Sequence, residues 1–396
     1  MNKHSRRDFL RSSSLGAGSS LLFGSATVSA EVEPGLETSA GSFGFTAFRH
    51  GVASGDPLQD RVIIWTRVTV SPKARWLRRV PVGWEAALDP EFRQVVRRGF
   101  TLTSRRRDFT VKIDLVGLKP GLDYYYRFNT LTAWSSIGCT RTLPMAGVEQ
   151  VKLAVMSCSN YPAGYFNVYT DAAQLPDLDA VCHLGDYIYE YGPGEYATEN
   201  ADAIGRSFVP GNDFEILDLR GYRDRYAQYR TDAGLQALHA HVPWICVWDD
   251  HEVANDAWKT GAENHNPELG EGEFADRKRA ALRAYYEWMP IRPPLPSNRE
   301  VIYRSFDFGD LVSLYMLDTR LIGRDQQLNY LDYIGLDGSF EAVRFGADIS
   351  DPGRELLGSE QLQWLTSKLV GSPATWQVLG QQQLIGRMTV PAELLF

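Results

Sequence analysis

Residues 178–186 read LDAVCHLGD, an apolar run that ends in a carboxylate. Four further runs have the same form, apolar residues followed by polar ones: VKLAVMSCSN (151–160), VPWICVWDDHE (242–252), LVSLYMLDTR (311–320) and TWQVLGQQQ (375–383). Continuous apolar runs of this length are typical of strands that are covered on both faces. Stretches with helical periodicity, at 220–240, 274–289 and 358–370, separate some of these runs and suit the covering helices. The pattern predicts an α/β domain over residues 150–396.

Upstream of this domain, residues 45–145 alternate between apolar and polar side chains and contain no convincing helical period. Three segments are strand-like: RVIIWTRVTV (61–70), DFTVKIDLV (108–116) and YYYRFNT (124–130). Turns rich in glycine and proline separate them, and GLKPGLDYYYRF (117–128) resembles the tyrosine corner of immunoglobulin-like folds. We expect a small antiparallel β-sandwich of the immunoglobulin or fibronectin kind, so that the chain combines an all-β domain with an α/β domain.

The first 30 residues have the features of an export signal. Ser5-Arg6-Arg7-Asp8-Phe9-Leu10 is a twin-arginine pattern, a modest apolar stretch follows, and Val28-Ser29-Ala30 is a small-residue cleavage site. We therefore expect export through the twin-arginine (Tat) machinery to the periplasm or beyond the cell, with residues 31–44 as a linker. A chance Arg-Arg in a basic tail is the simpler alternative.

The charge balance limits the kinds of partner. The whole chain has a formal charge of −8, and without residues 1–30, which hold four of its 41 basic and one of its 49 acidic residues, the charge is −11. Such a balance argues against electrostatic capture of nucleic acid or anionic lipid. No run after the leader reaches the roughly 18 apolar residues that a membrane-spanning helix needs. A small anion bound at a local cationic site remains compatible with this charge.

Four cysteines are few for an exported chain of this size, so disulfides are not expected to hold it together. Cys182 and Cys246 lie inside apolar runs and are interpreted as buried thiols, with a disulfide between them as the alternative. Cys158 differs, because it follows an apolar run in the way that Asp186 does.

Functional side chains in such sheets gather beyond the carboxyl ends of the strands. Here those ends carry Cys158, Asp186, the run Asp249-Asp250-His251-Glu252, and Asp318 with Arg320. Each has a simpler explanation alone: Asp186 as a turn cap, His251 as a hydrogen-bonded core histidine, Arg320 as a partner of Asp318. Together, a thiolate, carboxylates, an imidazole and a phenol indicate a site for more than one metal ion.

The donor types indicate which ions are suitable. Carboxylates favour Ca²⁺ or Mg²⁺, thiolate and imidazole favour transition metals, and a phenolate from Tyr187 or Tyr189 calls for an ion such as Fe³⁺. The sequence contains no Walker loop, no G-x-G-x-x-G and no G-x-S-x-G motif, so it does not support nucleotide cradling or serine hydrolysis.

With these residues in view, the chain resembles the PhoD-type alkaline phosphatases/phosphodiesterases of the metallophosphatase superfamily. The resemblance depends on long blocks: HGVASGDP, SCSNYPAGYFNVY, HLGDYIYEYGPGEY, YAQYRTD, PWICVWDDHEVANDAW, RAYYEWMPIR and MLDTRLIGRDQQ. It implies an amino-terminal β-sandwich followed by a four-layered αββα domain. It also implies Fe³⁺ and Ca²⁺ as cofactors, and phosphate monoesters and diesters, small or polymeric, as substrates.

Carried over residue by residue, the resemblance implies that Cys158 and Tyr189 are ligands of iron and that Asp186 bridges metals. It implies that Asp250 is a ligand on the side of the second metal and that His251 faces the leaving group. Tyr187 and Tyr191 are then packing and lid residues. The chain departs from the family in one respect: the family places further histidine ligands late in the domain, whereas the last histidine here is His265. We therefore expect a chain truncated at its carboxyl end, with an incomplete set of ligands.

The implied reaction is metal-assisted hydrolysis, in which a metal-bound hydroxide or oxo group attacks phosphorus in line. His251 would protonate the leaving alkoxide, and Arg320 would hold a phosphate oxygen unless it pairs with Asp318. Two alternatives stay open: a phosphodiesterase acting mainly on phospholipid or teichoic-acid type polymers, and a non-catalytic exported binding protein.

Overall fold

The computed structural model describes residues 46–74, 76–293 and 300–386. The strands are β1 (Thr46–Ala47), β2 (Val52–Gly55), β3 (Arg61–Arg67), β4 (Thr69–Val70), β5 (Arg79–Ala87), β6 (Val95–Ser104), β7 (Thr110–Val116), β8 (Asp123–Asn129), β9 (Gly138–Arg141), β10 (Leu153–Met156), β11 (Ala180–His183), β12 (Trp244–Cys246), β13 (Arg304–Phe308), β14 (Val312–Met316) and β15 (Trp376–Gly380). The α-helices are α2 (Asn167–Ala172), α3 (Leu219–Tyr229), α4 (Ala233–His241), α5 (Phe274–Trp288), α6 (Ala342–Ile349) and α7 (Ser359–Gly371). The expected leader, 1–30, and linker, 31–44, lie outside the described residues.

The first part of the chain forms two sheets that share one apolar core. One sheet has the strand order β6-β5-β8-β9, and the other contains β2, β3 and β7. Side chains of both fill the core, which includes Val62, Val82, Val111 and Tyr126. The tyrosine corner is confirmed, because the Tyr124 hydroxyl accepts a hydrogen bond from the Lys119 amide at 2.8 Å and donates one to the Lys119 carbonyl at 3.3 Å.

The all-β part is not a separate body, which the sequence did not predict. Strand β2 pairs in parallel with β12, so one six-stranded sheet runs through both parts in the order β10-β11-β12-β2-β3-β7. A Cβ on Gly55 would lie 2.4 Å from the Trp244 carbonyl oxygen and 2.3 Å from that of Pro290, so only glycine fits at this crossing. Beside it, Asp56 forms an ion pair with Arg304 at 2.5 Å.

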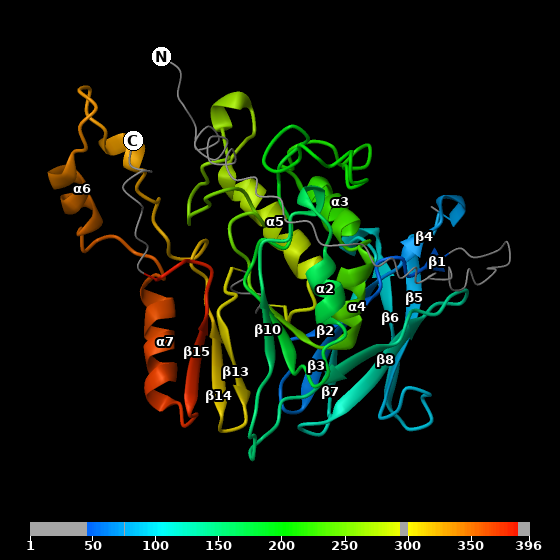
Figure 1. Cartoon of the computed structure of the whole chain (residues 1–396). Helices are drawn as coiled ribbons and strands as arrows, with labels where there is room; N and C mark the ends of the chain where they lie inside the picture. The colour runs from blue at the N-terminus through cyan, green and yellow to red at the C-terminus, as the bar shows by residue number, and fades with distance from the viewer. Residues whose placement is uncertain (1–45, 75, 294–299, 387–396) are drawn as a thin grey trace, which may run out of the picture.

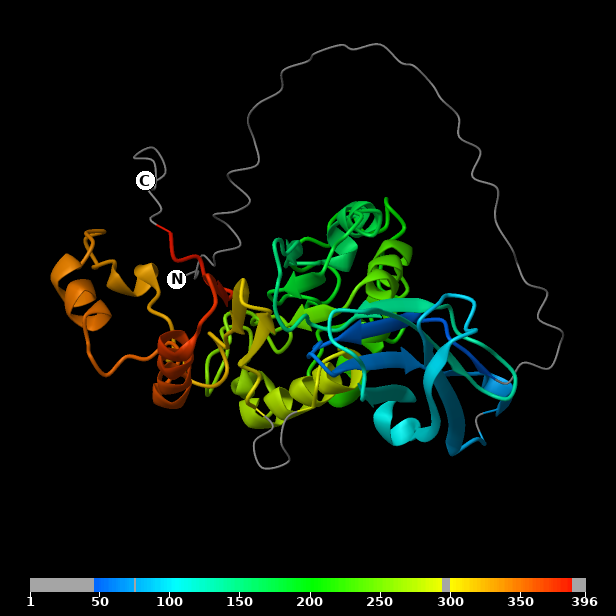
Figure 2. The same ribbon diagram turned by 90° about the horizontal axis from the view of Figure 1, so that it is seen from below.

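The second part places two sheets against each other. Strands β10, β11 and β12 are parallel neighbours, and β13, β14 and β15 form the other sheet. The two sheets share the largest core, in which the Cys182 thiol lies 3.6 Å from the Met316 sulfur. Cys182 and Cys246 are free buried thiols, as the main interpretation of the sequence had them. Helix α7 packs on the other side of the β13–β15 sheet, where Leu365 contacts Tyr315 and Leu317 (Figures 1 and 2).

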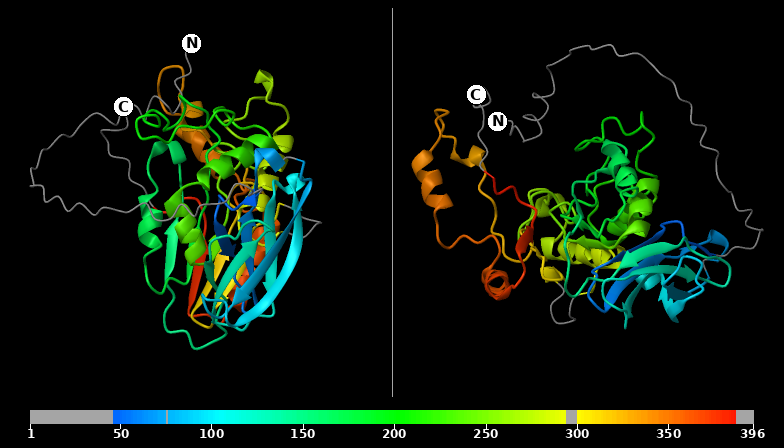
Figure 3. Two further views of the ribbon diagram at one scale, coloured as in Figure 1. Left: turned by 90° about the vertical axis from the view of Figure 1, so that its right-hand side faces the viewer. Right: turned by 60° about the horizontal axis from the view of Figure 1, so that its bottom comes forward.

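Local signals in the sequence account for the main helices. The helical stretch expected over 220–240 divides into α3 and α4, because the Asp232 side chain caps a new helix by accepting a hydrogen bond from the Leu235 amide at 3.0 Å. Helix α5 buries residues at the spacing of one helical face, among them Phe274, Ala281 and Tyr285. Helix α6 stands apart from the two sheets (Figures 1 and 3). Within the described ranges, no helix has the length and apolar character that crossing a bilayer requires.

Candidate metal centre

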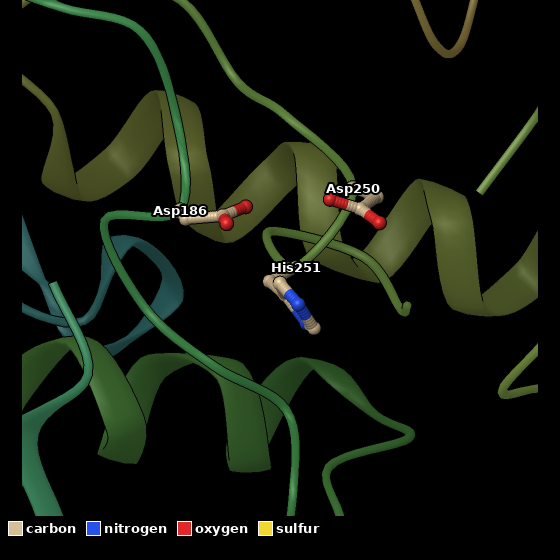
Figure 4. Close-up of side chains that lie close together, drawn as sticks. All are labelled: Asp186, Asp250 and His251. Carbon is tan, nitrogen blue, oxygen red and sulfur yellow. The ribbon is translucent and has the colours of Figure 1, made fainter. Parts of the chain in front are cut away.

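Three predicted site residues meet beyond the carboxyl ends of two neighbouring parallel strands. Asp186 lies three residues after β11, and Asp250 and His251 follow β12. One ligand atom from each lies within 4.8 Å of the others, and all three side chains are buried. Figure 4 shows the two carboxylates facing each other with the imidazole beside them. The sheet topology therefore produces the cluster, since parallel strands end at the same edge.

Unusual backbone conformations hold the loops that carry these residues. Cys158 and Asp186 both adopt left-handed φ angles, 60° and 55°, which cost roughly 1–3 kcal/mol each for residues other than glycine. Two backbone hydrogen bonds join the loops: the Cys158 amide donates to the Gly185 carbonyl at 3.1 Å, and the Ser159 amide donates to the Asp186 carbonyl at 2.8 Å. A Cβ at Gly185, where φ is 109°, would lie 2.2 Å from the Asp249 amide nitrogen. The close approach of the loops therefore requires glycine there.

Asp186 carries a buried charge that the described protein groups only partly satisfy. Its Oδ2 accepts a hydrogen bond from the Tyr189 hydroxyl at 3.1 Å, but its Oδ1 has no hydrogen-bond partner among the described residues. Burial raises the pKa of Asp186 to about 6, with Asp250 adding to the increase and His251 opposing it. A buried, unpaired carboxylate oxygen is costly, and a bound cation would satisfy it.

Neighbouring charges, rather than burial, decide the direction of the pKa shifts of Asp250 and His251. Burial alone would raise the pKa of Asp250, but His251 and Arg320 outweigh it and hold the pKa below its usual value. Burial alone would likewise lower the pKa of His251, but Glu190 and Asp250 outweigh it and raise the pKa to about 10. At neutral pH the site therefore contains a charged imidazole and two carboxylates that are mostly ionised, of which Asp186 is the one that burial destabilises.

Cys158 and Tyr189 adjoin the same cluster. Cys158 is exposed toward solvent on one side, and partial burial together with the Asp186 charge raises the pKa of its thiol to about 11. The Tyr189 ring lies 4.2 Å from the His251 ring, centroid to centroid, and burial together with Asp186 and Cys158 raises the pKa of its hydroxyl. The structure thus places a thiol and a phenol beside the carboxylates. Metal coordination would have to deprotonate both groups.

Arg320 and Asp318 do not pair through their side chains. The Arg320 guanidinium contacts Asp249 at 2.6 Å and lies 3.4 Å from both Asp250 and Asp256. The Asp318 carboxylate instead accepts hydrogen bonds from the backbone amides of Arg320 and Leu321, both at 2.8 Å. Asp318 therefore shapes the turn that directs Arg320 toward the site.

Comparison with known proteins assigns the chain to a family. A family model described as PhoD-like phosphatase matches residues 153–394, and the model of the N-terminal domain of PhoD-like phosphatases matches residues 35–144. The chain belongs to the PhoD-like phosphatase family.

Two members of this family give the extent of the likeness. The chain is 40% identical to alkaline phosphatase D of Bacillus subtilis (strain 168) over 390 residues, which are 96% of this chain and 63% of that protein. A solved structure described as "Structure of PhoD" matches with a TM-score of 0.74 and 40% identity, covering 88% of this chain and 64% of the other. The chain therefore spans a little under two thirds of the length of both relatives.

Two glutamates support this PhoD-like site: Glu190, which was not singled out in the sequence, and Glu252, which was named only as the last residue of the run Asp249-Asp250-His251-Glu252. The Glu190 carboxylate binds His251 Nδ1 at 2.7 Å and also accepts hydrogen bonds from the Asn255 amide at 2.7 Å and the Asn264 side chain at 2.9 Å. Glu252 accepts hydrogen bonds from the amides of Tyr187 (2.7 Å), Asp249 (2.9 Å) and Asp186 (3.0 Å), which fastens the two loops together. The signal for Glu190 was available, because it interrupts the aromatic segment YIYEYG (187–192) with a charge that burial requires to be satisfied.

A cavity of about 570 Å³ opens beside the cluster. Cys158 and Tyr189 line it together with aromatic side chains, among them Tyr165, Phe166 and Tyr196. It gives a ligand access to the side of the site where the thiol and phenol lie.

Proposed function

We propose that this chain is a metal-dependent phosphoric ester hydrolase, an alkaline phosphatase acting on phosphate monoesters and diesters. The observation that carries the proposal is the buried cluster of Asp186, Asp250 and His251, in which one carboxylate oxygen has no partner among the described residues. The membership of the chain in the PhoD-like phosphatase family supports the reaction class.

We also propose that the two facing sheets and their outer helices form the four-layered αββα arrangement.

The donor set fits the metals that the sequence predicted, Fe³⁺ and Ca²⁺. Asp186 and Asp250 offer hard oxygen ligands, and Cys158 and Tyr189 offer a thiolate and a phenolate to a transition metal. The burial of unpaired charge at Asp186 gives a physical reason for a cation, since its binding would remove the repulsion between the two aspartates. When bound, the ions would activate water and neutralise charge on the phosphate.

His251 is placed to act as the general acid. Its Nδ1 contacts Glu190, which fixes the ring orientation and leaves Nε2 without a hydrogen-bond partner among the described residues. A proton held at Nε2 would be available to the leaving alkoxide. Tyr189 packs against the face of the ring and limits its movement.

Arg320 is proposed to contact a phosphate oxygen while it also pairs with carboxylates of the site. Its guanidinium contacts Asp249 and lies near Asp250, so it balances carboxylate charge at the site edge. A phosphate that approaches Asp250 would meet the guanidinium there.

We also propose that the chain is exported by the twin-arginine route.

The proposal is tested by metal analysis and by the release of phosphate from p-nitrophenyl phosphate, comparing the wild type with Asp186→Ala. The control is Asp171→Ala, which removes an exposed carboxylate on α2. We expect Asp186→Ala to lose bound metal and at least about 100-fold in turnover, because it removes a ligand rather than a group that supports one. Equal turnover in the wild type and Asp186→Ala would refute the metal centre.

The ligand role of Tyr189 has its own spectroscopic test. A phenolate bound to Fe³⁺ gives a visible charge-transfer band, which we expect in the iron-loaded wild type and not in Tyr189→Phe. An iron-loaded wild type without colour would exclude this ligand.

A further inference from the structure

The all-β part meets helix α5 away from the metal centre (Figure 2). A large groove of about 1260 Å³ lies there, lined mainly by β6, β7, the turn between them and α5, with Arg79 from the start of β5. None of the site residues described above lines it. Both β6 and β7 are outermost strands of their sheets, so the groove runs between two sheet edges.

The groove collects positive charge in a protein whose net charge is −8. Five cationic side chains line it, against two acidic ones: Arg79, Arg106, Arg107, Lys112 and Arg283, against Asp114 and Glu287. Both acids already have partners, since Asp114 contacts Arg292 at 2.5 Å and Glu287 contacts Arg223 at 2.6 Å and Arg283 at 3.1 Å. Among the described residues, no ion pair neutralises the other four cations.

Lys112 is the deepest of these cations. Its ammonium donates one hydrogen bond, to the Tyr286 carbonyl at 2.5 Å, and has two further protons to donate. The pKa of Lys112 is lowered to about 7, chiefly by burial; Asp56 and Glu287 oppose the shift, and Arg304 and Arg107 add to it. An anion bound beside Lys112 in the groove would favour its charged form.

The rim of the groove is apolar. Phe100 is 81% exposed and Leu102 is 52% exposed, and both lie on β6. Large apolar side chains that remain exposed beside a cationic groove offer a surface for the carbon skeleton of a charged ligand. The volume exceeds what one phosphate or sulfate ion fills, which favours a ligand that carries several anionic groups.

We propose that this groove is a second binding site, for a multivalent oxyanion such as a sugar or polyol that bears several phosphate or sulfate groups. Arg79, Arg106, Arg107 and Lys112 bind its charged groups, and Phe100 and Leu102 cover its carbon skeleton. The inference does not depend on the proposed hydrolase activity, because its evidence lies in a different part of the molecule.

The test measures binding of myo-inositol hexasulfate to the full-length protein as purified, by isothermal titration calorimetry. This probe carries sulfate esters, which a phosphatase reaction does not consume. The groove variants are Arg79→Ala, Arg107→Ala and Lys112→Met. The matched controls are Arg78→Ala and Arg105→Ala, which remove an exposed arginine outside the groove, next to Arg79 and in the same turn as Arg107.

We expect each groove substitution to weaken binding roughly tenfold or more, as the loss of a charge-assisted hydrogen bond does, and the controls to change it less than twofold. Turnover of p-nitrophenyl phosphate should be unchanged in the groove variants. Equal affinities in groove and control variants would overturn the proposal. So would hexasulfate acting as a competitive inhibitor with an inhibition constant equal to its dissociation constant, since the probe would then occupy the metal centre. Binding of inorganic sulfate as tight as that of hexasulfate would overturn the multivalent assignment.

Discussion

Replacing Asp186 by asparagine should stabilise the metal-free protein. Burial raises the pKa of Asp186 from its ordinary value of 3.8 to about 6. At pH 8 both the folded and the unfolded protein carry the ionised group, so the folded state bears the full cost of the shift, about 3 kcal/mol. Asparagine is neutral and can still accept the hydrogen bond from Tyr189, so it removes this cost. At pH 4 the carboxylate is protonated in the folded protein and partly protonated in the unfolded one, so most of the advantage should disappear.

The same substitution at Asp250 should have the opposite effect. His251 and Arg320 hold the pKa of Asp250 below its usual value despite burial, so its ionised form stabilises the folded state. Asp250→Asn should therefore lower the free energy of unfolding of the metal-free protein at pH 8. The pair is a matched control, because both variants remove one carboxylate charge from the same cluster.

Metal should reverse the sign of the effect at Asp186. A cation that binds the folded protein stabilises it by mass action, and loss of a carboxylate ligand weakens that binding. Wild-type protein should then gain stability on addition of metal, whereas Asp186→Asn should gain less and become the less stable of the two. The carboxylate therefore costs stability in the empty site and contributes it in the filled one.

The assay is thermal unfolding followed by circular dichroism, at pH 8 and pH 4, with a chelator and, at pH 8, also after addition of Fe³⁺ and Ca²⁺. With the chelator at pH 8 we expect the midpoint of Asp186→Asn to rise by about 5 °C, and that of Asp250→Asn to fall. A lower midpoint for chelated Asp186→Asn, or shifts in the same direction for both variants, would refute the electrostatic reasoning. An unchanged order of stabilities after metal addition would refute the ligand role.

Three further predictions follow from other parts of the structure. Glu190→Gln removes the charged partner of the site histidine, and turnover of p-nitrophenyl phosphate should fall about 10- to 100-fold, with a loss of stability as at Asp250 because the pKa of Glu190 is lowered in the folded protein; wild-type turnover would contradict the positioning role. His50 and His183 are buried with pKa values lowered to about 3 by burial, so only the unfolded state takes up their protons as the pH falls below 6.5. Their combined contribution should decline by about 2.7 kcal/mol per pH unit between pH 6 and 4, opposite in sign to that of Asp186; the difference in urea unfolding between the wild type and the double variant His50→Gln/His183→Gln isolates it, and a difference that stays constant between pH 6 and 4 would contradict it. Tyr124→Phe should cost about 1–2 kcal/mol of stability, because it leaves the Lys119 amide without its partner, whereas Tyr125→Phe, one residue along the strand, should cost less.

The site was largely readable from local sequence, because its chemistry lies at strand ends. An apolar run followed by a charge indicates a buried strand that ends at a functional edge, and this pattern located Asp186 and Asp250 without knowledge of the pairing. The parallel pairing of β11 with β12 then brought these two residues together, as that reasoning expected. The predicted roles of all six site residues stay predictions, although their side chains lie at or beside the cluster: Asp186, Asp250, Cys158, Tyr189, His251 and Arg320.

Ion pairs between residues that are far apart in the sequence were less predictable. The sequence suggested Asp318 as the partner of Arg320, because the two are neighbours in the chain. In the structure the guanidinium reaches Asp249, which is 71 residues away in sequence, and Asp318 binds backbone amides. Charge pairing between distant residues depends on where the loops are held, and no local pattern encodes that.

The sequence by itself indicated the buried strands that end in polar side chains, the helical stretches that contain α3, α4, α5 and α7, and that one part of the chain is all-β. Periodicity and turn residues act over a few neighbours, so these features do not need the rest of the molecule. Only the tertiary structure decided that β2 and β12 join the two parts in one sheet, and that four cations without an ion-pair partner among the described residues meet in a groove beside α5. Both depend on contacts between segments far apart in the chain, whose free energy exists only once the whole fold has formed.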